Sequence, residues 1–201
     1  SIYDNDPAGA SVTNVDDGTG NRAIELSGSG KDNGYRLRLD DGVTKWNNQT
    51  QFLARWRMKC SEDFTVMFEC DTSGGRRYVY YSSTGKDLLG SGTYVHHGLG
   101  GSVDDGTWQQ FSRNLAADLK DAQPGNSLLA VHGVYIRGSG LIDDVELWLD
   151  TDEDRLSDWA EDNTYGTSPT DADSDGDGLT DGEEIYVWQT DPDAADSDGD
   201  G

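Results

Sequence analysis

Basic residues are scarce in this sequence, and long apolar runs are missing from it. The 201 residues include 15 Lys and Arg against 39 Asp and Glu, which gives a net charge of −24 at pH 7. Binding to nucleic acid through a general positive field is therefore disfavoured, because phosphate binding depends on clustered cations. No apolar run approaches the roughly 20 residues that a spanning helix needs, so we expect no membrane span.

The sequence also contains no signal peptide and has only two cysteines, Cys60 and Cys70. We expect the signal peptide to have been removed by processing or trimming. Two cysteines near one another in a secreted chain suggest a disulfide. A simple hairpin about Glu62 and Asp63 would not place them opposite each other, however. Two alternatives stay open: a disulfide, or two buried small residues.

The acidic residues concentrate at one end of the chain. Residues 150–201 hold 19 acidic residues and 1 basic residue, a net charge of −18, whereas residues 1–149 hold 20 acidic and 14 basic residues, a net charge of −6. The length allows one sizeable domain and an appendage. We therefore predict two parts, a domain over residues 1–149 and a separate acidic segment over residues 150–201.

The most informative stretch of the acidic segment is 173–184, which reads DSDGDGLTDGEE. Its spacing matches the twelve-residue calcium loop, in which alternate acidic residues surround the ion and the chain turns sharply at a glycine, here Gly178. An acidic solvated linker would not require this register. We predict a Ca²⁺ site with the ligands Asp173, Asp175, Asp177, Asp181 and Glu184 and the carbonyl oxygen of Leu179.

The loop repeats with a period of 23 residues. The preceding copy has Arg155 in place of the turn glycine, which we expect to weaken its site. A following copy breaks off at Gly201, so we expect a fragment of a longer protein. The predicted ligands of the first copy are Asp150, Asp152, Asp154, Leu156, Asp158 and Glu161, and those of the third are Asp196, Asp198 and Asp200. Units at a fixed short period indicate stacked repeats.

This segment, Asp150 to Gly201, resembles thrombospondin type 3-like calcium repeats with EF-hand-type loops. The resemblance implies a rigid, calcium-ordered spacer. In bacteria such spacers often follow a β-sandwich module in secreted proteins that act on polysaccharides. We therefore expect a secreted or cell-surface location, where calcium is plentiful.

Residues 1–149 show short runs of period two between Gly and Asn/Asp turns, which is the pattern of an all-β sandwich. We predict a two-sheet jelly roll of roughly nine strands, with a brief helical turn at 116–121. The expected strands are 23–26, 34–39, 52–60, 64–70, 76–81, 93–97, 108–115, 128–137 and 141–149. The expected core residues are Trp56, Phe64, Phe68, Phe111, Val131 and Leu147.

Two stretches of this domain carry a second resemblance. RGSG followed by IDDVEL, at 137–147, and WQQFSRNL, at 108–115, are similar to the closing segment of β-sandwich carbohydrate-binding modules of secreted enzymes from polysaccharide-degrading, often marine, bacteria. The resemblance implies a jelly roll, sugar binding and one structural calcium held near the first and last strands. It makes Asp4 and Asp144 candidate ligands, the alternative being a surface turn and an ordinary strand end.

Alternation along two strands predicts a cationic surface. It comprises Arg36, Arg38, Arg55, Arg57 and Lys59, which would form one platform if both strands lie in the same sheet. Guanidinium groups bind carboxylate or sulfate bidentately, so the predicted ligand is an acidic or sulfated polysaccharide. The alternative is an exposed face whose cations pair with Glu69 or Asp87.

Aromatic residues predict a second surface, because sugar recognition uses flat aromatic faces. Tyr78 and Tyr80 share one face of their strand, and Arg77 falls on the other. The further candidates for sugar contact are Tyr94, His96 and, in a polar loop, Trp46. Ordinary packing is the alternative for each of them.

From these patterns we predict a noncatalytic, monomeric carbohydrate-binding module that holds the catalytic domain of its parent enzyme against a polysaccharide. A hydrolase would need two suitably spaced carboxylates, and no acidic pair alternates along one strand. A lyase could use Tyr94 and His96 as acid and base with Arg77 neutralising the uronate. The third alternative is a calcium-dependent adhesin or surface stalk protein.

Overall fold

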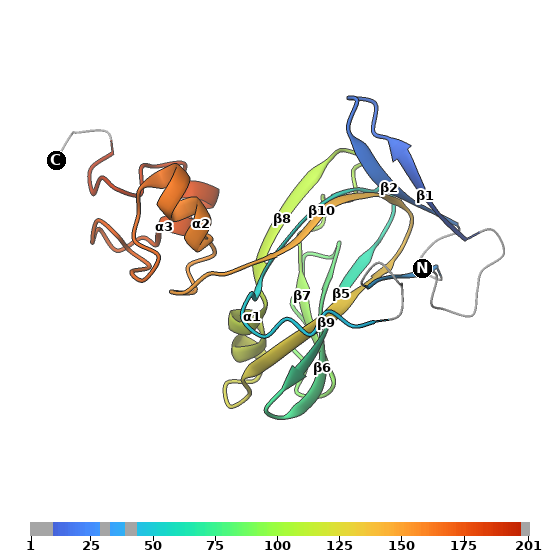
Figure 1. Cartoon of the computed structure of the whole chain (residues 1–201), viewed down its shortest axis with the longest axis horizontal. Helices are drawn as coiled ribbons and strands as arrows, with labels where there is room; N and C mark the ends of the chain where they lie inside the picture. Colours follow the sequence, from blue (N-terminus) through green and yellow to red (C-terminus); the bar gives the residue numbers. More distant parts are fainter. Residues whose placement is uncertain (1–9, 29–32, 39–43, 198–201) are drawn as a thin grey trace.

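The computed structural model describes residues 10–28, 33–38 and 44–197. A β-sandwich comes first, and a string of acidic loops follows it (Figure 1). Strand β10 (Gly140–Trp148) leads into these loops, so the last strand of the sandwich is also the connection to the repeats.

The sandwich consists of two five-stranded sheets. The first sheet has the order β1 (Ser11–Asp16), β2 (Arg22–Ser27), β10, β4 (Leu53–Lys59) and β8 (Gln109–Asn114). The second has the order β3 (Gly34–Leu37), β9 (Leu128–Arg137), β5 (Thr65–Thr72), β6 (Gly75–Ser82) and β7 (Tyr94–Gly98). Only β6 and β7 pair in parallel among these described strands. The prediction of an all-β, two-sheet sandwich is confirmed.

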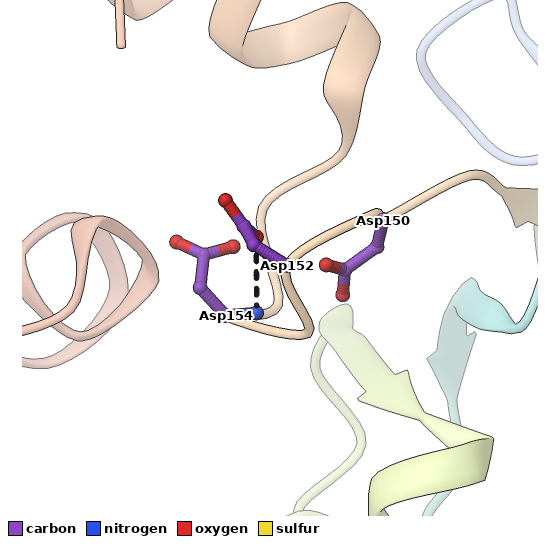
Figure 2. Close-up of side chains that lie close together, drawn as sticks. All are labelled: Asp150, Asp152 and Asp154. Carbon is purple, nitrogen blue, oxygen red and sulfur yellow. Dashed lines mark hydrogen bonds between the residues drawn. The ribbon is translucent and has the colours of Figure 1, made fainter. Parts of the chain in front are cut away.

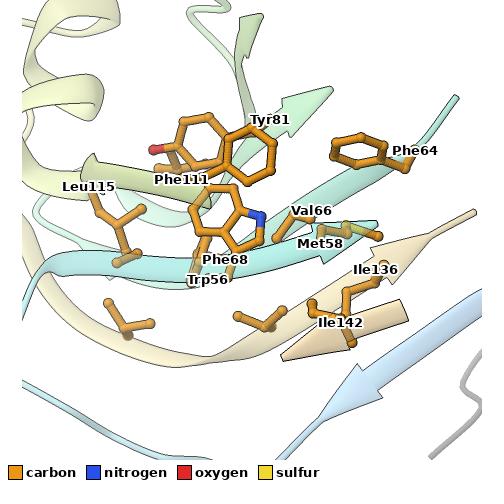
Figure 3. Packing of buried hydrophobic residues seen from close by; sticks show 14 of the residues in the cluster. Trp56, Met58, Phe64, Val66, Phe68, Tyr81, Phe111, Leu115, Ile136 and Ile142 are labelled. Atoms are coloured by element: carbon orange, nitrogen blue, oxygen red, sulfur yellow. The ribbon is translucent and has the colours of Figure 1, made fainter. Parts of the chain in front are cut away.

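The core lies between the sheets and is built around Trp56 (Figure 3). The Trp56 ring lies 5.1 Å from that of Phe111, 5.5 Å from that of Tyr81 and 5.7 Å from that of Phe68, measured between ring centroids. Alternation predicted this core, because inward residues of a strand recur every second position. Of the predicted core residues, Trp56, Phe64, Phe68, Phe111 and Val131 are buried, and Leu147 packs half-buried against them.

Cys60 and Cys70 are both buried and free. Cys70 belongs to β5 of the second sheet, whereas Cys60 directly follows β4 of the first. Burial raises the pKa of the Cys60 thiol to about 12, which keeps it protonated and unreactive at neutral pH. Of the two alternatives, the structure therefore has buried small residues rather than a disulfide.

Helix α1 (Leu115–Ala122) is longer than the predicted turn and contacts strands of both sheets. The Asn114 side chain caps it by accepting hydrogen bonds of 3.0 Å from the amides of Ala116 and Ala117. A cap of this kind stabilises a helix by about 1 kcal/mol. The same helix places Asp118 where it accepts two hydrogen bonds from Arg113 of β8, so α1 is tied to the first sheet.

A buried polar cluster holds the loop that contains Lys45 and Asn48 across the outer side of the second sheet. Glu69 of β5 is 2% exposed and accepts hydrogen bonds from Arg38, Lys45 and Tyr135. The loop itself pairs with β9, because the Asn48 amide donates to the Val131 carbonyl at 2.9 Å. Burial alone would raise the pKa of Glu69, but the three hydrogen bonds outweigh burial and lower that pKa to about 2.

The acidic segment forms two similar units. In the first, α2 (Asp158–Ala160) continues into the π-helical turn η2 (Glu161–Tyr165), and in the second, α3 (Asp181–Glu183) continues into η3 (Glu184–Trp188). Ser157 and Thr180 cap the two short helices in the same way. Among the described residues, no helix has the length and apolar character needed to cross a membrane.

We predict that Glu69→Gln destabilises the sandwich by about 3 kcal/mol at pH 7, which is the free energy that corresponds to its lowered pKa. The folded pKa lies below the ordinary value of 4.5. The ionised side chain therefore stabilises the fold above that value, and the contribution is lost as the pH falls through the folded pKa. Urea unfolding of both proteins from pH 7 to pH 2.5 would measure this. Equal stability of the two proteins at pH 7 would contradict it.

Candidate functional site

The structure brings together three carboxylates in each acidic loop. Asp150, Asp152 and Asp154 lie with one oxygen each within 4.8 Å of one another (Figure 2), and Asp173, Asp175 and Asp177 do the same. These residues occupy positions 1, 3 and 5 of the predicted loops. Hard dications prefer such oxygen ligands, so the two clusters are candidate calcium centres.

The two loops share an internal hydrogen-bond pattern. In both, the carboxylate at position 1 accepts from the amide at position 6, that is, Asp150 from Arg155 at 3.2 Å and Asp173 from Gly178 at 3.0 Å. Position 5 accepts from the amide at position 7 in both loops as well. The 23-residue repeat of the sequence is therefore a repeat of backbone geometry.

The residues at position 9, Asp158 and Asp181, accept hydrogen bonds within their own loops. Both oxygens of each accept hydrogen bonds from the amide and hydroxyl of the residue at position 2, which is Thr151 or Ser174, at 2.7 to 2.8 Å. They hold the loop closed. Position 9 of such loops often reaches the ion through water, which is compatible with this arrangement.

Six carboxylate oxygens of the two loops are buried and have no hydrogen-bond partner among the described residues. They are Oδ1 of Asp150, Oδ2 of Asp152, both Oε atoms of Glu161, Oδ2 of Asp175 and Oε2 of Glu184. Buried polar atoms are normally paired, and unpaired carboxylate oxygens are costly. Because all six belong to predicted ligands, the donor set fits a bound dication. Calcium itself stays a prediction.

The electrostatics of the first loop also favour a bound cation. Burial, followed by the charges of nearby aspartates, raises the pKa of Glu161 to about 8. Burial likewise raises the pKa of Asp150 to about 7 and that of Asp154 to about 6. These carboxyls therefore need either protons or a cation to stay buried.

The first loop is connected to its surroundings on both sides. Asn114 of the sandwich donates a hydrogen bond of 3.0 Å to Asp150, and the Gly182 amide of the second repeat donates one of 2.7 Å to Asp154. A Cβ atom at Gly182 would lie 2.1 Å from the Asp154 carbonyl oxygen, so only glycine permits this approach. Neither contact could be predicted from the local residue pattern.

Of the other predicted metal ligands, the structure describes Asp144 and Asp196. In the third loop the structure describes Asp196, whereas Asp198 and Asp200 lie outside the described residues, as does Asp4. Asp144 is exposed, and its carboxylate lies 3.3 Å from an Arg57 nitrogen. It therefore forms an ion pair on the outside of the first sheet.

The predicted platform of five cations does not form. Arg36 belongs to β3 in the second sheet and Arg38 directly follows it, whereas Arg55, Arg57 and Lys59 belong to β4 in the first sheet. Arg38 is moreover a buried partner of Glu69, with a side chain 3% exposed. The condition for the platform, a shared sheet, is not met.

The aromatic surface does form on the outer side of the second sheet. The rings of Tyr78 and Tyr94 stack with centroids 5.3 Å apart, and those of Tyr80 and His96 stack at 4.5 Å. Tyr94 is 57% exposed, whereas His96 is buried. Tyr135 of β9 packs edge-on against Tyr78. We did not predict Tyr135 as part of this surface, although alternation along its strand could have indicated it.

Two further predicted residues do not join this surface. The Arg77 side chain donates to Gln123 at 2.9 Å, and its strand partner is the inward Cys70. It therefore does not share a face with Tyr94 and His96, as a lyase site would require. Trp46 is half-buried and packs partly against the core, and its contact with a sugar ring stays a prediction.

Comparison with known proteins supports the assignment of the repeats. Residues 173–192 match the bacterial TSP3 repeat. This match covers the second loop and the linker after it, and the first loop shares its hydrogen-bond pattern. No curated protein matches the chain.

Two solved structures are similar to the chain at a low level. "Biofilm associated protein - B domain" is 13% identical to this chain, with a TM-score of 0.24. The match covers 92% of this chain and 53% of the other chain. "Biofilm associated protein - BSP domain" is 12% identical with a TM-score of 0.23, covering 91% of this chain and 36% of its own. This chain thus spans about half of the first and about a third of the second. With such TM-scores the likeness carries no structural argument.

We predict that Glu161→Gln makes the calcium-free repeats more stable at pH 8 and lowers their calcium affinity. In the wild type, the folded pKa of Glu161 lies above its ordinary value of 4.5. The folded form therefore binds more protons than the unfolded form between these values, and its stability rises as the pH falls from 8 towards 5. Calcium competes with those protons, so its affinity should fall over the same range.

Calorimetry of protein stripped of metal on a chelating resin, at pH 8, 6.5 and 5, would test both effects. The substitution should flatten the pH dependence of the calcium-free transition. Glu153→Gln, at an exposed position of the same loop, is the matched control and should leave that dependence in place. A calcium-free transition that weakens on acidification in the wild type would contradict the prediction.

Proposed function

We propose that the chain is a noncatalytic adhesion module of an extracellular protein, in which calcium-ordered repeats hold a β-sandwich in a fixed position. The side chains buried inside the repeats support this proposal. Among described residues from 150 to 197, the buried hydrophobic side chains are Leu156 and Ala160, whereas Asp154, Glu161, Asp181 and Glu184 are buried carboxylates. These two side chains supply only a few kcal/mol of burial, so the fold of this segment depends on neutralising its carboxylates, which a bound cation would do at neutral pH.

The sandwich and the repeats are joined by direct contacts, which supports a stiff connection. The Asp158 amide donates a hydrogen bond to the carbonyl oxygen of Leu149, which is the residue directly after β10. Trp148 of β10 and Trp159 of α2 have ring centroids 6.0 Å apart. With the Asn114 to Asp150 hydrogen bond, these contacts orient the first repeat on the sandwich. A spacer of this kind presents the sandwich away from the body of a larger protein.

Removing calcium should strongly destabilise the repeats and leave the sandwich folded. We expect two calorimetric transitions with calcium, and chelation at pH 8 should shift the one that belongs to residues 150–197 to a much lower temperature and leave the other in place. Limited proteolysis with chelator should then cut within those residues and spare the strands of the sandwich. Identical thermograms and digestion patterns with and without calcium would refute the proposal.

A second candidate is the predicted carbohydrate-binding module, which targets the catalytic domain of a parent enzyme to a polysaccharide. The stacked Tyr78 and Tyr94 pair and the neighbouring Tyr80 favour it, because tyrosine rings offer flat faces and hydroxyl groups to sugars. The lyase alternative has less support, since Arg77 does not share their face. Absence of catalysis stays a prediction.

For this second candidate we predict that Tyr94→Ala and Tyr80→Ala each weaken glycan binding on an array by about tenfold, which corresponds to one aromatic contact of about 1.4 kcal/mol. Leu129→Ala is the matched control, because Leu129 is an exposed apolar residue of β9. Binding that survives both tyrosine variants would exclude this surface. Release of shortened glycans by the wild type would instead favour an enzyme.

A further inference from the structure

Arg155 is an unusual residue for its position. It is the only basic residue from 150 to 201, and it occupies the loop position that is Gly178 in the second repeat. Both have left-handed backbone conformations, with φ of +83° at Arg155 and +99° at Gly178. A side chain in this conformation costs about 1 kcal/mol or more, which glycine avoids. The arginine therefore strains its own calcium loop.

The Arg155 side chain faces a groove instead of the acidic loops around it. Its guanidinium forms no hydrogen bond or ion pair within the described part of the chain, although its segment has a net charge of −18. It lines a groove of about 390 Å³ between the sandwich and the second repeat. Strand β8 contributes Gln110 and Ser112 to one wall, and η3 contributes Tyr186 to the other.

The groove contains further polar groups without partners. The Ser112 hydroxyl is buried and has no hydrogen-bond partner among the described residues. Ser112 pairs in register with Arg55 of β4, whose guanidinium likewise forms no ion pair in the described structure. Gln110 also lines a neighbouring depression of about 260 Å³ that includes Arg55, together with Arg57 and its ion-pair partner Asp144, and Glu146. The groove thus continues onto the outer side of the first sheet.

We propose that this groove binds an anionic saccharide, with Arg155 and Arg55 contacting its carboxylate or sulfate group and Tyr186 packing on a sugar ring. Guanidinium groups match these anions in geometry and charge. Tyr186 is 44% exposed and presents an aromatic wall. Gln110 and Ser112 supply hydrogen bonds for hydroxyl groups. Arg155 thereby offers a positive charge to the occupant, beside the one acidic residue of the groove lining, Glu183, in a chain whose net charge otherwise repels anions.

Calcium controls this site, because one of its walls belongs to the second repeat. Tyr186 belongs to η3, which directly follows α3, and the Gly182 amide of α3 donates a hydrogen bond to Asp154 of the first calcium loop. Without ordered loops the wall that carries Tyr186 separates from the wall formed by β8. This step rests on the proposed ordering of the repeats by calcium.

The test is calorimetric titration of the whole chain with short oligosaccharides, with calcium and with chelator. The probes are galacturonic acid oligomers, sulfated oligomers, neutral glucose oligomers and poly-glutamate. Titration of calcium into each saccharide alone controls for direct binding of the ion. With calcium we expect binding of a carboxylated or a sulfated oligomer, and the stronger of the two identifies the anion. We expect chelation to weaken this binding at least tenfold.

Arg155→Gly separates the groove from the calcium loop. It restores the turn glycine, so calcium binding and the thermal transition of the repeats should be kept or strengthened, whereas saccharide affinity should fall about tenfold. Tyr186→Ala should weaken saccharide binding similarly. Trp188→Ala, an exposed aromatic of the same helical turn, is the matched control and should leave binding unchanged.

Unchanged affinity in both Arg155→Gly and Tyr186→Ala would overturn the proposal. So would binding that persists in chelator and depends on Tyr94, which would place the ligand on the second sheet. Tighter binding of poly-glutamate than of any saccharide would overturn the saccharide assignment. Absence of binding to every probe would overturn the site as well, while intact calorimetric evidence for calcium ordering would leave the proposed function standing.

Discussion

The repeats depend on the burial of carboxylates that only a cation or protons can neutralise. Glu161, Asp181 and Glu184 are each at most 1% exposed, in positions where an ordinary small domain buries apolar side chains. Like charges in such an environment repel one another strongly. The conformation of the segment, and its attachment to the sandwich, therefore both depend on the same ion-binding geometry.

The parts of this structure that could be predicted from sequence are those set by neighbouring residues. The ligands at positions 1, 3 and 5 fall within a few residues of one another, so their spacing alone indicated both loops. Alternation identified most strands of the sandwich and its core for the same reason. Strand β1 was missed because SVTNVD contains only two apolar residues and lies mostly exposed. A strand with few buried side chains shows little alternation of apolar and polar residues.

What could not be predicted depends on contacts between distant residues. Alternation placed the arginines of β3 and β4 outward, but the choice of sheet depends on strand pairing, which local pattern does not encode. Arg38 is buried instead of exposed because it pairs with Glu69, which is 31 residues away in the sequence. By contrast, the parallel pairing of β6 with β7 aligns Tyr78 with Tyr94 and Tyr80 with His96. The sequence pattern identified these four residues as candidates but could not show that they are neighbours.

The same distinction explains why the first loop tolerates an arginine where the second has a glycine. Asp150 and Asp154 each have a partner outside their loop, Asn114 and Gly182. The hydrogen bonds described for Asp173 and Asp177 come from within their own loop. External partners fix the first pair of ligands independently of the turn, so strain at Arg155 need not displace them. The second loop has only its turn, and there the glycine is required.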